Sequence, residues 1–305
     1  MYDVIVAGGG PAGLTAALYA LRNGKSVLVI EKEGFGGQIT HSPRVENFPG
    51  TLCISGNELA DQMLDQILAQ GAELEVGNVI SVSKDDGVFS VRTEEGGDYE
   101  SKAVILATGV KHRMLGLPGE TELVGEGISY CAVCDGDFYE GKSVCVAGGG
   151  NSALQEAILL AGKCREVTVL QDLPYLTGEA KLQEALFANG NVKAVTGVKI
   201  TGLVSSEDGL SAVEIREEES GITRRISCDG LFVAIGLIPE NDAFADLAYL
   251  TDDGYFDSDE TCVTATPGVF AAGDCRRKEI RQLTAAASDG ASAALAACRY
   301  IDSIS

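Results

Sequence analysis

Residues 3–31, DVIVAGGGPAGLTAALYALRNGKSVLVIE, place a glycine-rich turn between an apolar strand and an amphipathic helix. The turn is Gly8-x-Gly10-x-x-Gly13, and a second apolar strand follows the helix and ends on Glu31. Gly8 permits a tight turn, Gly10 lets a pyrophosphate approach the backbone, and Gly13 lets the helix pack closely on the strand. The helix N-terminus would face the phosphates, and Glu31 stands where an acid can bond a ribose diol. We therefore predict a dinucleotide site with these cofactor contacts: Gly8, Gly10, Pro11, Ala12, Gly13, Glu31 and Lys32.

The composition suits a folded α/β protein. The chain has 305 residues, enough for two domains, and it is 45% hydrophobic with 38 glycines. Its net charge of −22, from 23 Lys and Arg against 45 Asp and Glu, disfavours binding to nucleic acid or to anionic membranes. It has no apolar run of about 18 residues or more and no basic leader, so we expect a cytoplasmic protein outside the membrane. Nine cysteines in that compartment argue against a disulfide scaffold.

Two distant segments extend the first site. The run TPGVFAAGD (266–274) is a predicted strand that ends on Gly273-Asp274, and VILATGV (104–110) is another apolar strand. Here the chain resembles the flavoprotein reductases that have two dinucleotide-binding domains, in which this Asp contacts the ribitol of FAD. The resemblance implies an FAD-binding domain built from both ends of the chain, 1–114 and 242–305, with residues 115–241 inserted.

The inserted segment repeats the same pattern. A strand leads into Gly148-x-Gly150-x-x-Ala153, a helical stretch follows, and a further strand covers 166–170. The alternating runs at 78–100 and 195–228 predict antiparallel sheet additions. The predicted fold class is α/β, with two Rossmann-like dinucleotide-binding domains of three-layer ββα form, the second inserted in the first. The insert would be an NAD(P)-binding-like domain that carries a Cys-x-x-Cys pair.

The pair Cys131-Ala-Val-Cys134 has three possible interpretations: a metal-binding knuckle, a structural cysteine pair or a redox centre. A zinc site needs a second pair of ligands, but the chain has one Cys-x-x-Cys and only two histidines, His41 and His112. The pair directly precedes the second nucleotide-binding pattern. The redox reading is therefore favoured, and no metal is expected.

The resemblance then becomes specific to the low-molecular-weight thioredoxin reductases, over essentially the whole chain. It is carried by CAVCDGDFYEGKSVCVAGGGNSA (131–153), GGQITHSPRVENFPG (36–50) and RQLTAAASDGASAALAA (281–297). It implies that Cys134 lies against the flavin, that Cys131 attacks a partner disulfide, and that Asp135 manages the protons. It also implies thioredoxin or a thioredoxin-like protein as partner, a homodimer, and rotation of the insert about linkers near 116–119 and 236–239. The implied FAD contacts are Gly37, Gln38, Asn47, Ala107, Thr108, Gly109, Gly273, Asp274, Arg281, Gln282 and Leu283.

One segment departs from that family. NADPH-dependent members carry a His-Arg-Arg run after the second strand of the insert, whereas this chain has Gln171, Asp172 and Leu173 there. An acid repels the 2′-phosphate, and each missing charged hydrogen bond costs roughly 1.5–3 kcal/mol, so NADPH should be a poor donor. Asp172 would instead bond the ribose diol of NADH beside the turn of Gly148, Gly150 and Ala153.

A second hypothesis for the electron donor is also open. In this hypothesis the nucleotide site of the insert is vestigial, and reduced ferredoxin delivers electrons through the flavin. An acidic ferredoxin would need a local basic patch on this acidic chain, for which the sequence offers Arg276, Arg277, Lys278 and Arg281.

Two alternative functions remain open at this stage. One is a flavoprotein dithiol oxidase or reductase for a small-molecule disulfide, and the other is a non-catalytic flavin redox sensor. Cys275 follows the flavin-contacting Asp and is the one further thiol with a candidate redox role. The remaining cysteines are predicted to be buried small hydrophobes: Cys53, Cys145, Cys164, Cys228, Cys262 and Cys298.

Overall fold

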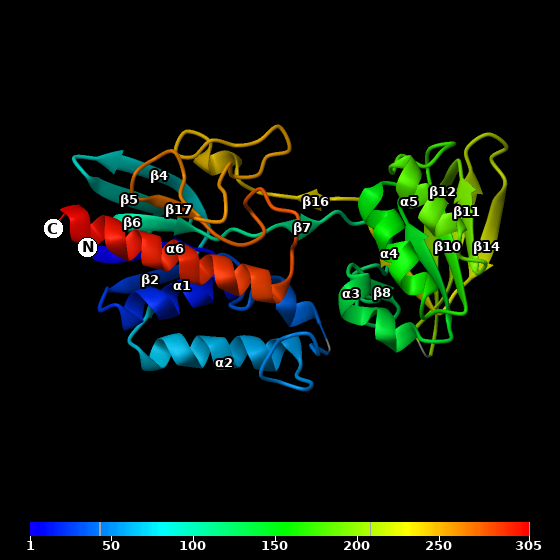
Figure 1. The fold of residues 1–305 in the computed structure, drawn as a ribbon, viewed down its shortest axis with the longest axis horizontal. Helices are drawn as coiled ribbons and strands as arrows, with labels where there is room; N and C mark the ends of the chain where they lie inside the picture. Colours follow the sequence, from blue (N-terminus) through cyan, green and yellow to red (C-terminus); the bar gives the residue numbers. More distant parts are fainter. Residues whose placement is uncertain (43, 208, 305) are drawn as a thin grey trace. The chain divides into compact units, whose positions relative to one another are not determined.

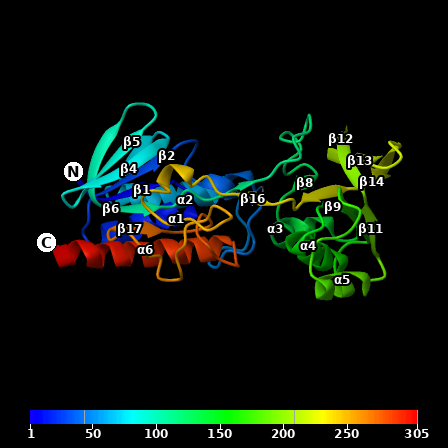
Figure 2. The same cartoon turned by 90° about the horizontal axis from the view of Figure 1, so that it is seen from above.

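The structure, a computed structural model, describes residues 1–42, 44–207 and 209–304. It divides into two compact units (Figures 1 and 2). Unit 1 comprises residues 1–111 and 238–305, and unit 2 comprises residues 112–237. The ranges predicted from the sequence place both junctions a few residues further along the chain. The connections themselves, β7 (Lys111–His112) and β16 (Leu237–Ile238), pair as a two-stranded sheet.

Unit 1 is built on a seven-stranded sheet. The order is β3 (Glu73–Val76), β2 (Val27–Glu31), β1 (Tyr2–Ala7), β6 (Asp98–Leu106), β5 (Val88–Thr93) and β4 (Val79–Asp85), and β17 (Val269–Ala271) pairs with the end of β6. β4 and β5 join antiparallel, as the alternating run predicted, and the other pairs are parallel. The helices are α1 (Pro11–Arg22), α2 (Gly56–Ala69) and α6 (Leu283–Ile304), with short turns η1 (Gly37–His41) and η3 (Asp242–Phe244).

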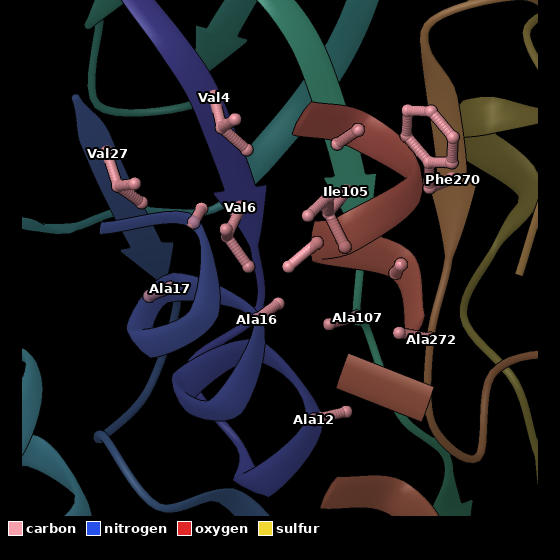
Figure 3. Close-up of a cluster of buried hydrophobic side chains, with 14 of the residues drawn as sticks. Val4, Val6, Ala12, Ala16, Ala17, Val27, Ile105, Ala107, Phe270 and Ala272 are labelled. Carbon is pink, nitrogen blue, oxygen red and sulfur yellow. The ribbon is translucent and has the colours of Figure 1, made fainter. Parts of the chain in front are cut away.

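The alternation of side chains along β1 creates two cores. Val4 and Val6 pack toward α1 and α6, as Figure 3 shows for the labelled residues, whereas Ile5 and Ala7 face the opposite core. Helices α1 and α6 approach each other through small residues. A Cβ at Gly290 of α6 would lie 2.2 Å from the carbonyl oxygen of Ala12, so only glycine allows this spacing. The two ends of the chain are thereby packed into one unit.

Unit 2 repeats this plan with a five-stranded parallel sheet. Helices α4 and α5 pack on one face, and a three-stranded antiparallel sheet packs on the other. The predicted α/β class, with a second unit of the same architecture inserted in the first, is confirmed. The elements are β8 (Ile128–Ser129), α3 (Ala132–Asp135), η2 (Gly136–Tyr139), β9 (Ser143–Ala147), α4 (Asn151–Ala161), β10 (Glu166–Gln171), α5 (Ala180–Phe187), β11 (Val192–Thr196), β12 (Val198–Ser206), β13 (Gly209–Glu217), β14 (Thr223–Ser227) and β15 (Gly230–Val233).

Candidate functional site

The glycine turn of unit 1 sits where the parallel strands β1 and β6 end. Gly8 has φ +113°, and a Cβ there would lie 2.2 Å from the carbonyl oxygen of Ala107. The turn therefore packs directly on the segment after β6. On its other side, the Gly36 N–H donates to the Gly9 carbonyl at 2.8 Å, which brings the predicted Gly37 beside Gly10. Helix α1 begins after Gly10 without a side-chain cap, so its first N–H groups are available to an anion.

Glu31 closes this turn from the end of β2. Its Oε2 accepts the N–H of Gly9 at 2.6 Å, and its Oε1 accepts the N–H of Glu33 at 3.0 Å. The acid therefore stands beside the turn, as the strand–turn–helix pattern predicted. The neighbouring Lys32, also predicted as a contact, is directed instead to an ion pair with Glu240.

Asn241 holds the segment after β6 in place and was missed by sequence reasoning. This residue is fully buried, and its Oδ1 accepts the hydroxyl of Thr108 at 2.7 Å. Its Nδ2 donates to the carbonyls of Gly254 and Cys275 at 2.9 and 3.0 Å. One amide thus joins the predicted contact Thr108 to the loop that follows β17. No sequence pattern marks this residue, because its partners are distant along the chain.

Asp274 presents an unpaired oxygen at the end of β17. Its Oδ1 is buried and has no hydrogen-bond partner among the described residues. Burial raises the pKa of Asp274, although the positive charges of Lys278 and Arg281 oppose the rise. Arg281 lies over the ring of Tyr255, with its guanidinium 4.4 Å from the ring centre. A buried acceptor without a partner indicates a donor that arrives with a ligand.

The segments around Asn47 and Gln282 also meet in unit 1. The Asn47 amide donates to the Gln282 Oε1 at 3.3 Å, although the two residues lie far apart in the sequence. Leu283 begins α6 directly after this contact. Gln38 lies in η1, next to Gly37. The predicted contacts Ala107, Thr108, Gly109, Gly273, Asp274 and Arg281 lie in the segments that follow β6 and β17, whose carboxyl ends are adjacent in the sheet.

The Cys-x-x-Cys pair lies in unit 2 and forms a disulfide. The Cα atoms of Cys131 and Cys134 are 5.3 Å apart. Cys131 caps the single-turn helix α3, and its Sγ accepts the N–H of Cys134 at 3.2 Å. Cys134 is exposed, and Val133 between the two cysteines is 55% exposed. The disulfide is thus presented to solvent on a short, backbone-anchored turn.

Asp135 is the half-buried acid of this centre. Its Oδ2 accepts the hydroxyl of Ser129 at 2.7 Å, and its Oδ1 is buried with no partner in the described part of the chain. Burial raises the pKa of Asp135, and the Ser129 hydrogen bond only partly opposes this. A carboxyl that holds its proton more tightly than usual can serve as an acid near neutral pH. Ser129 was not predicted from the sequence.

The second glycine turn closely matches the first. The N–H groups of Thr177 and Gly178 donate to the Gly149 carbonyl at 2.9 and 2.8 Å, as Gly36 does to Gly9. A Cβ at Gly149 would lie 2.7 Å from Cδ of Gln171, so the Gln171 side chain packs against this turn.

Gln171 ends β10 as Glu31 ends β2, and each side chain lies against its turn. Asp172 is instead exposed, and its Oδ1 accepts the N–H of Leu173 at 2.8 Å. The side chain that lies against the second turn is therefore Gln171, whereas the carboxylate of the predicted Asp172 bonds the adjacent backbone. The other predicted residues of this turn, Gly148, Gly150 and Ala153, lie at the end of β9 and the start of α4.

The expected basic docking patch is wrong. The side chains of Arg276 and Lys278 are only 3% and 6% exposed, and both bond Asp289 of α6. Arg277 is exposed but pairs with Asp257 at 3.1 Å. Of these three cations, two are therefore held in the interior of unit 1, and the third forms an ion pair at the surface.

The remaining cysteines fall into two groups. Cys275 is fully buried, and burial raises the pKa of its thiol, which disfavours the reactive thiolate. Cys53 is exposed, contrary to expectation, because its loop after Gly50 lies on the surface. The other five are buried as predicted: Cys145, Cys164, Cys228, Cys262 and Cys298. In the described ranges no three His, Cys, Asp or Glu side chains form a metal-binding group. Among the same residues, no helix has the length and apolarity needed to cross a membrane.

Comparison with known proteins identifies the class. The family model described as pyridine nucleotide-disulphide oxidoreductase matches residues 2–290. The chain belongs to this family of oxidoreductases. It is 40% identical over 304 residues to a thioredoxin reductase of Treponema pallidum, with 99% of this chain and 98% of the relative covered.

Two further relatives narrow the class. A 34.2 kDa protein in the rubredoxin operon of Clostridium pasteurianum is 41% identical over 300 residues, covering 98% of this chain and 97% of that protein. The solved thioredoxin reductase of Streptococcus pyogenes matches with a TM-score of 0.94 and 38% identity, over 99% of both chains. The predicted resemblance to the low-molecular-weight thioredoxin reductases is confirmed.

FAD, which this family implies, fits the residues of unit 1. The buried Oδ1 of Asp274 lacks the donor that a ribitol hydroxyl would supply. A Cβ at Gly10 would meet nothing nearer than the Gly37 Cα at 3.9 Å, so the backbone there is open to a pyrophosphate. The uncapped start of α1 and the acid Glu31 complete a set of partners for phosphate and ribose.

Proposed function

We propose that this chain is a thioredoxin-disulfide reductase, which passes electrons from a donor through FAD to the Cys131–Cys134 disulfide and on to thioredoxin. The main support for the proposal is the disulfide at α3, whose Cys134 is exposed to solvent, next to the half-buried Asp135. One carboxyl oxygen of Asp135, Oδ1, has no hydrogen-bond partner among the described residues. The relatives from Treponema pallidum and Streptococcus pyogenes, both named thioredoxin reductase, support it over nearly the full chain.

The chemistry follows from two thiols and one acid. Bound FAD supplies a two-electron carrier between the donor and the disulfide. Once the pair is reduced, the Cys131 thiolate attacks the partner disulfide and forms a mixed disulfide, and the departing partner thiolate takes the Asp135 proton. Cys134 then gives its proton to the Asp135 carboxylate and attacks the Cys131 sulfur.

This second attack restores the Cys131–Cys134 disulfide and expels the second partner thiolate, which takes the proton that Cys134 gave to Asp135. Two electrons leave the chain in each cycle, and the partner leaves as a dithiol. The raised pKa of Asp135 suits this role, because a weaker acid keeps its proton until the leaving thiolate forms.

NADPH is proposed to be a poor donor. At the position where NADPH-dependent members carry cations, unit 2 has the neutral Gln171, the exposed carboxylate of Asp172 and the 40% exposed Leu173. Two donors remain, NADH and reduced ferredoxin. The intact second glycine turn supports NADH, whereas the exposed apolar run that includes the 61% exposed Tyr175 supports a disused site and ferredoxin.

The test compares the three donors in one experiment. FAD-loaded protein is mixed anaerobically with NADPH, NADH or reduced ferredoxin, and bleaching of the flavin absorbance is followed. Thioredoxin disulfide is then added, with low-molecular-weight disulfides in parallel. We expect bleaching by NADH or ferredoxin and preferential reduction of thioredoxin. Fast bleaching by NADPH would contradict the donor assignment, and turnover of small disulfides alone would favour the small-molecule alternative.

Two matched variants and two further measurements complete the test. Cys131→Ser and Cys134→Ser should each retain FAD and lose thioredoxin turnover, and a variant that keeps full turnover would exclude the dithiol mechanism. Sedimentation checks the proposed homodimer. Cell fractionation checks the proposed cytoplasmic location.

A further inference from the structure

Ser129 links the two chemical parts of the dithiol centre. It ends β8, where parallel pairing of Ser129 with Phe232 of β15 fixes its position, and it is only 3% exposed. Its Oγ accepts the N–H of Cys131 at 3.1 Å and donates its proton to Oδ2 of Asp135 at 2.7 Å. One hydroxyl therefore connects the backbone of Cys131 to the carboxyl of Asp135. Neighbouring hydrogen bonds in such a chain polarise one another.

The two oxygens of Asp135 are consequently unequal. Oδ2 already accepts a hydrogen bond from the Ser129 hydroxyl, whereas Oδ1 is buried and has no partner among the described residues. A hydroxyl that donates to a carboxylate stabilises the ionised form, and it makes the oxygen that it contacts the poorer place for a second proton. The transferable proton of Asp135 therefore belongs on Oδ1, which is free to meet a thiol, a thiolate or water.

The other titratable groups around α3 do not replace this contact. Tyr139 of η2 has a pKa raised to about 12, by burial first and by the Asp135 charge second. Asp137 of the same turn is paired with Lys163. Glu156 lies on α4, the helix packed on α3, and burial raises its pKa to about 7. In the described part of the chain, Ser129 is the one side chain that hydrogen-bonds to the Asp135 carboxyl.

We infer that Ser129 is a positioning residue for thiol–disulfide exchange: it holds Asp135 by Oδ2, directs the transferable proton to Oδ1, and keeps the carboxyl able to release that proton at neutral pH. The inference rests on the proposed exchange at the Cys131–Cys134 pair. The steps of that exchange involve Cys131, Cys134 and Asp135, and Ser129 is an additional residue. Ser129 touches neither sulfur through its side chain, so it acts through Asp135.

The first readout is the titration of Asp135 itself. The carboxyl band is followed by infrared spectroscopy on FAD-loaded protein reduced with dithiothreitol, and Asp135→Asn identifies the band. A hydrogen bond to a charged group is worth about 1.5–3 kcal/mol, so Ser129→Ala should raise the pKa of Asp135 by about 1–2 units. Ser129→Thr keeps the hydroxyl and should leave this pKa within about half a unit of the wild type.

A matched serine in the same unit serves as the control. Ser211 donates its hydroxyl to the carbonyl of Val204 at 3.0 Å, so Ser211→Ala also removes a hydroxyl from the fold without touching Asp135. This control should leave the Asp135 band unchanged. If Ser129→Ala does not load FAD, Ser129→Gly, which removes the hydroxyl together with the Cβ, replaces it.

The second readout is the pH profile of thioredoxin reduction. The part of the pH profile that depends on Asp135 ionisation should shift to higher pH in Ser129→Ala, by the same number of pH units as the pKa measured by infrared spectroscopy. Ser129→Thr should show the wild-type profile. An unchanged Asp135 titration in folded Ser129→Ala overturns the inference, as does a Ser129→Thr variant that behaves like Ser129→Ala. The infrared titration needs no partner protein. If thioredoxin is not reduced by any variant, the proposed function fails while this titration still decides the role of Ser129.

Discussion

Asp289 neutralises two buried cations, and replacing it with Asn should destabilise unit 1. Its carboxylate accepts hydrogen bonds from Arg276 Nε at 2.8 Å and Nη2 at 2.9 Å, from Lys278 Nζ at 2.8 Å, and from the Gly273 N–H at 3.0 Å. Asn keeps the shape of the side chain but removes the charge. Arg276 and Lys278 would then lose this buried counter-charge, and the 90% exposed Glu260, 4.0 Å from Arg276, is a weak substitute for it.

The structure sets the expected size of this effect. Removing one partner of a buried ion pair costs about 3–5 kcal/mol, because the remaining charge stays desolvated. Asp257→Asn is the matched control, since Asp257 pairs with the adjacent Arg277 at 3.1 Å, with both side chains exposed. An exposed pair contributes about 0.2–1 kcal/mol. Two Asp→Asn changes at neighbouring arginines should therefore differ severalfold in their effect on the free energy of unfolding.

The assay is denaturant unfolding of FAD-loaded protein, followed by circular dichroism and by flavin fluorescence. Burial alone would raise the pKa of Asp289, but the hydrogen bonds from Arg276 and Lys278 hold it below the ordinary value. A lowered folded-state pKa stabilises the fold above the unfolded value, about 3.9, and this stability is lost as pH falls through the folded value. The difference in the free energy of unfolding between wild type and Asp289→Asn should therefore become smaller below about pH 4. Equal, small losses in the two variants at pH 7 would refute the reasoning.

Three further predictions can be tested by substitution. Gly8→Ala places a Cβ 2.2 Å from the Ala107 carbonyl oxygen at positive φ, so the purified protein should lose FAD, read from the ratio of flavin to protein absorbance; full FAD content would contradict the close packing. Cys275→Ala should leave thioredoxin turnover unchanged, because the buried thiol has a raised pKa, and a large loss would give this thiol a redox role. If NADH bleaches the flavin, Gln171→Ala should weaken the apparent binding of NADH about tenfold, whereas Asp172→Ala, at an exposed position, should not. A larger effect of Asp172→Ala would instead support Asp172 as the ribose contact.

Short-range pattern was sufficient to predict both βαβ units and the dithiol. Residues 3–31 carry apolar spacing, turn glycines and a terminal acid in one continuous stretch, and each signal is local. The side chain that lies against the glycine turn of unit 2 could not be predicted in the same way. Gln171 and Asp172 are adjacent, and the one that faces the turn depends on which residue is last in β10. A change of one position moves a side chain to the other face of a strand, so counting residues from the glycine turn could not decide it.

Individual side-chain contacts between distant segments could not be predicted from local pattern. Arg276, Arg277 and Lys278 form a run that indicates an exposed basic patch, yet two of the three are buried. Their burial depends on Asp289, which reaches them from α6 because that helix packs along α1. Asn241 and Ser129 are similar cases. Each is an ordinary polar residue in sequence and becomes significant through hydrogen bonds that only the folded chain brings together.

The repeat within the chain locates a difference between the glycine turns of its two units. Each glycine turn follows a buried strand, and its carbonyl accepts N–H bonds from the segment after the following strand, β2 in unit 1 and β10 in unit 2. Each turn also packs against the last side chain of β2 or β10. In unit 1 this side chain is the acid Glu31, which accepts the Gly9 N–H, and in unit 2 it is the neutral Gln171. Because the backbone scaffold is shared, a difference in ligand must come from the side chains at this edge of the sheet. An amide can still bond a diol but adds no charge to oppose or attract a phosphate, so unit 2 is expected to bind a dinucleotide more weakly than unit 1.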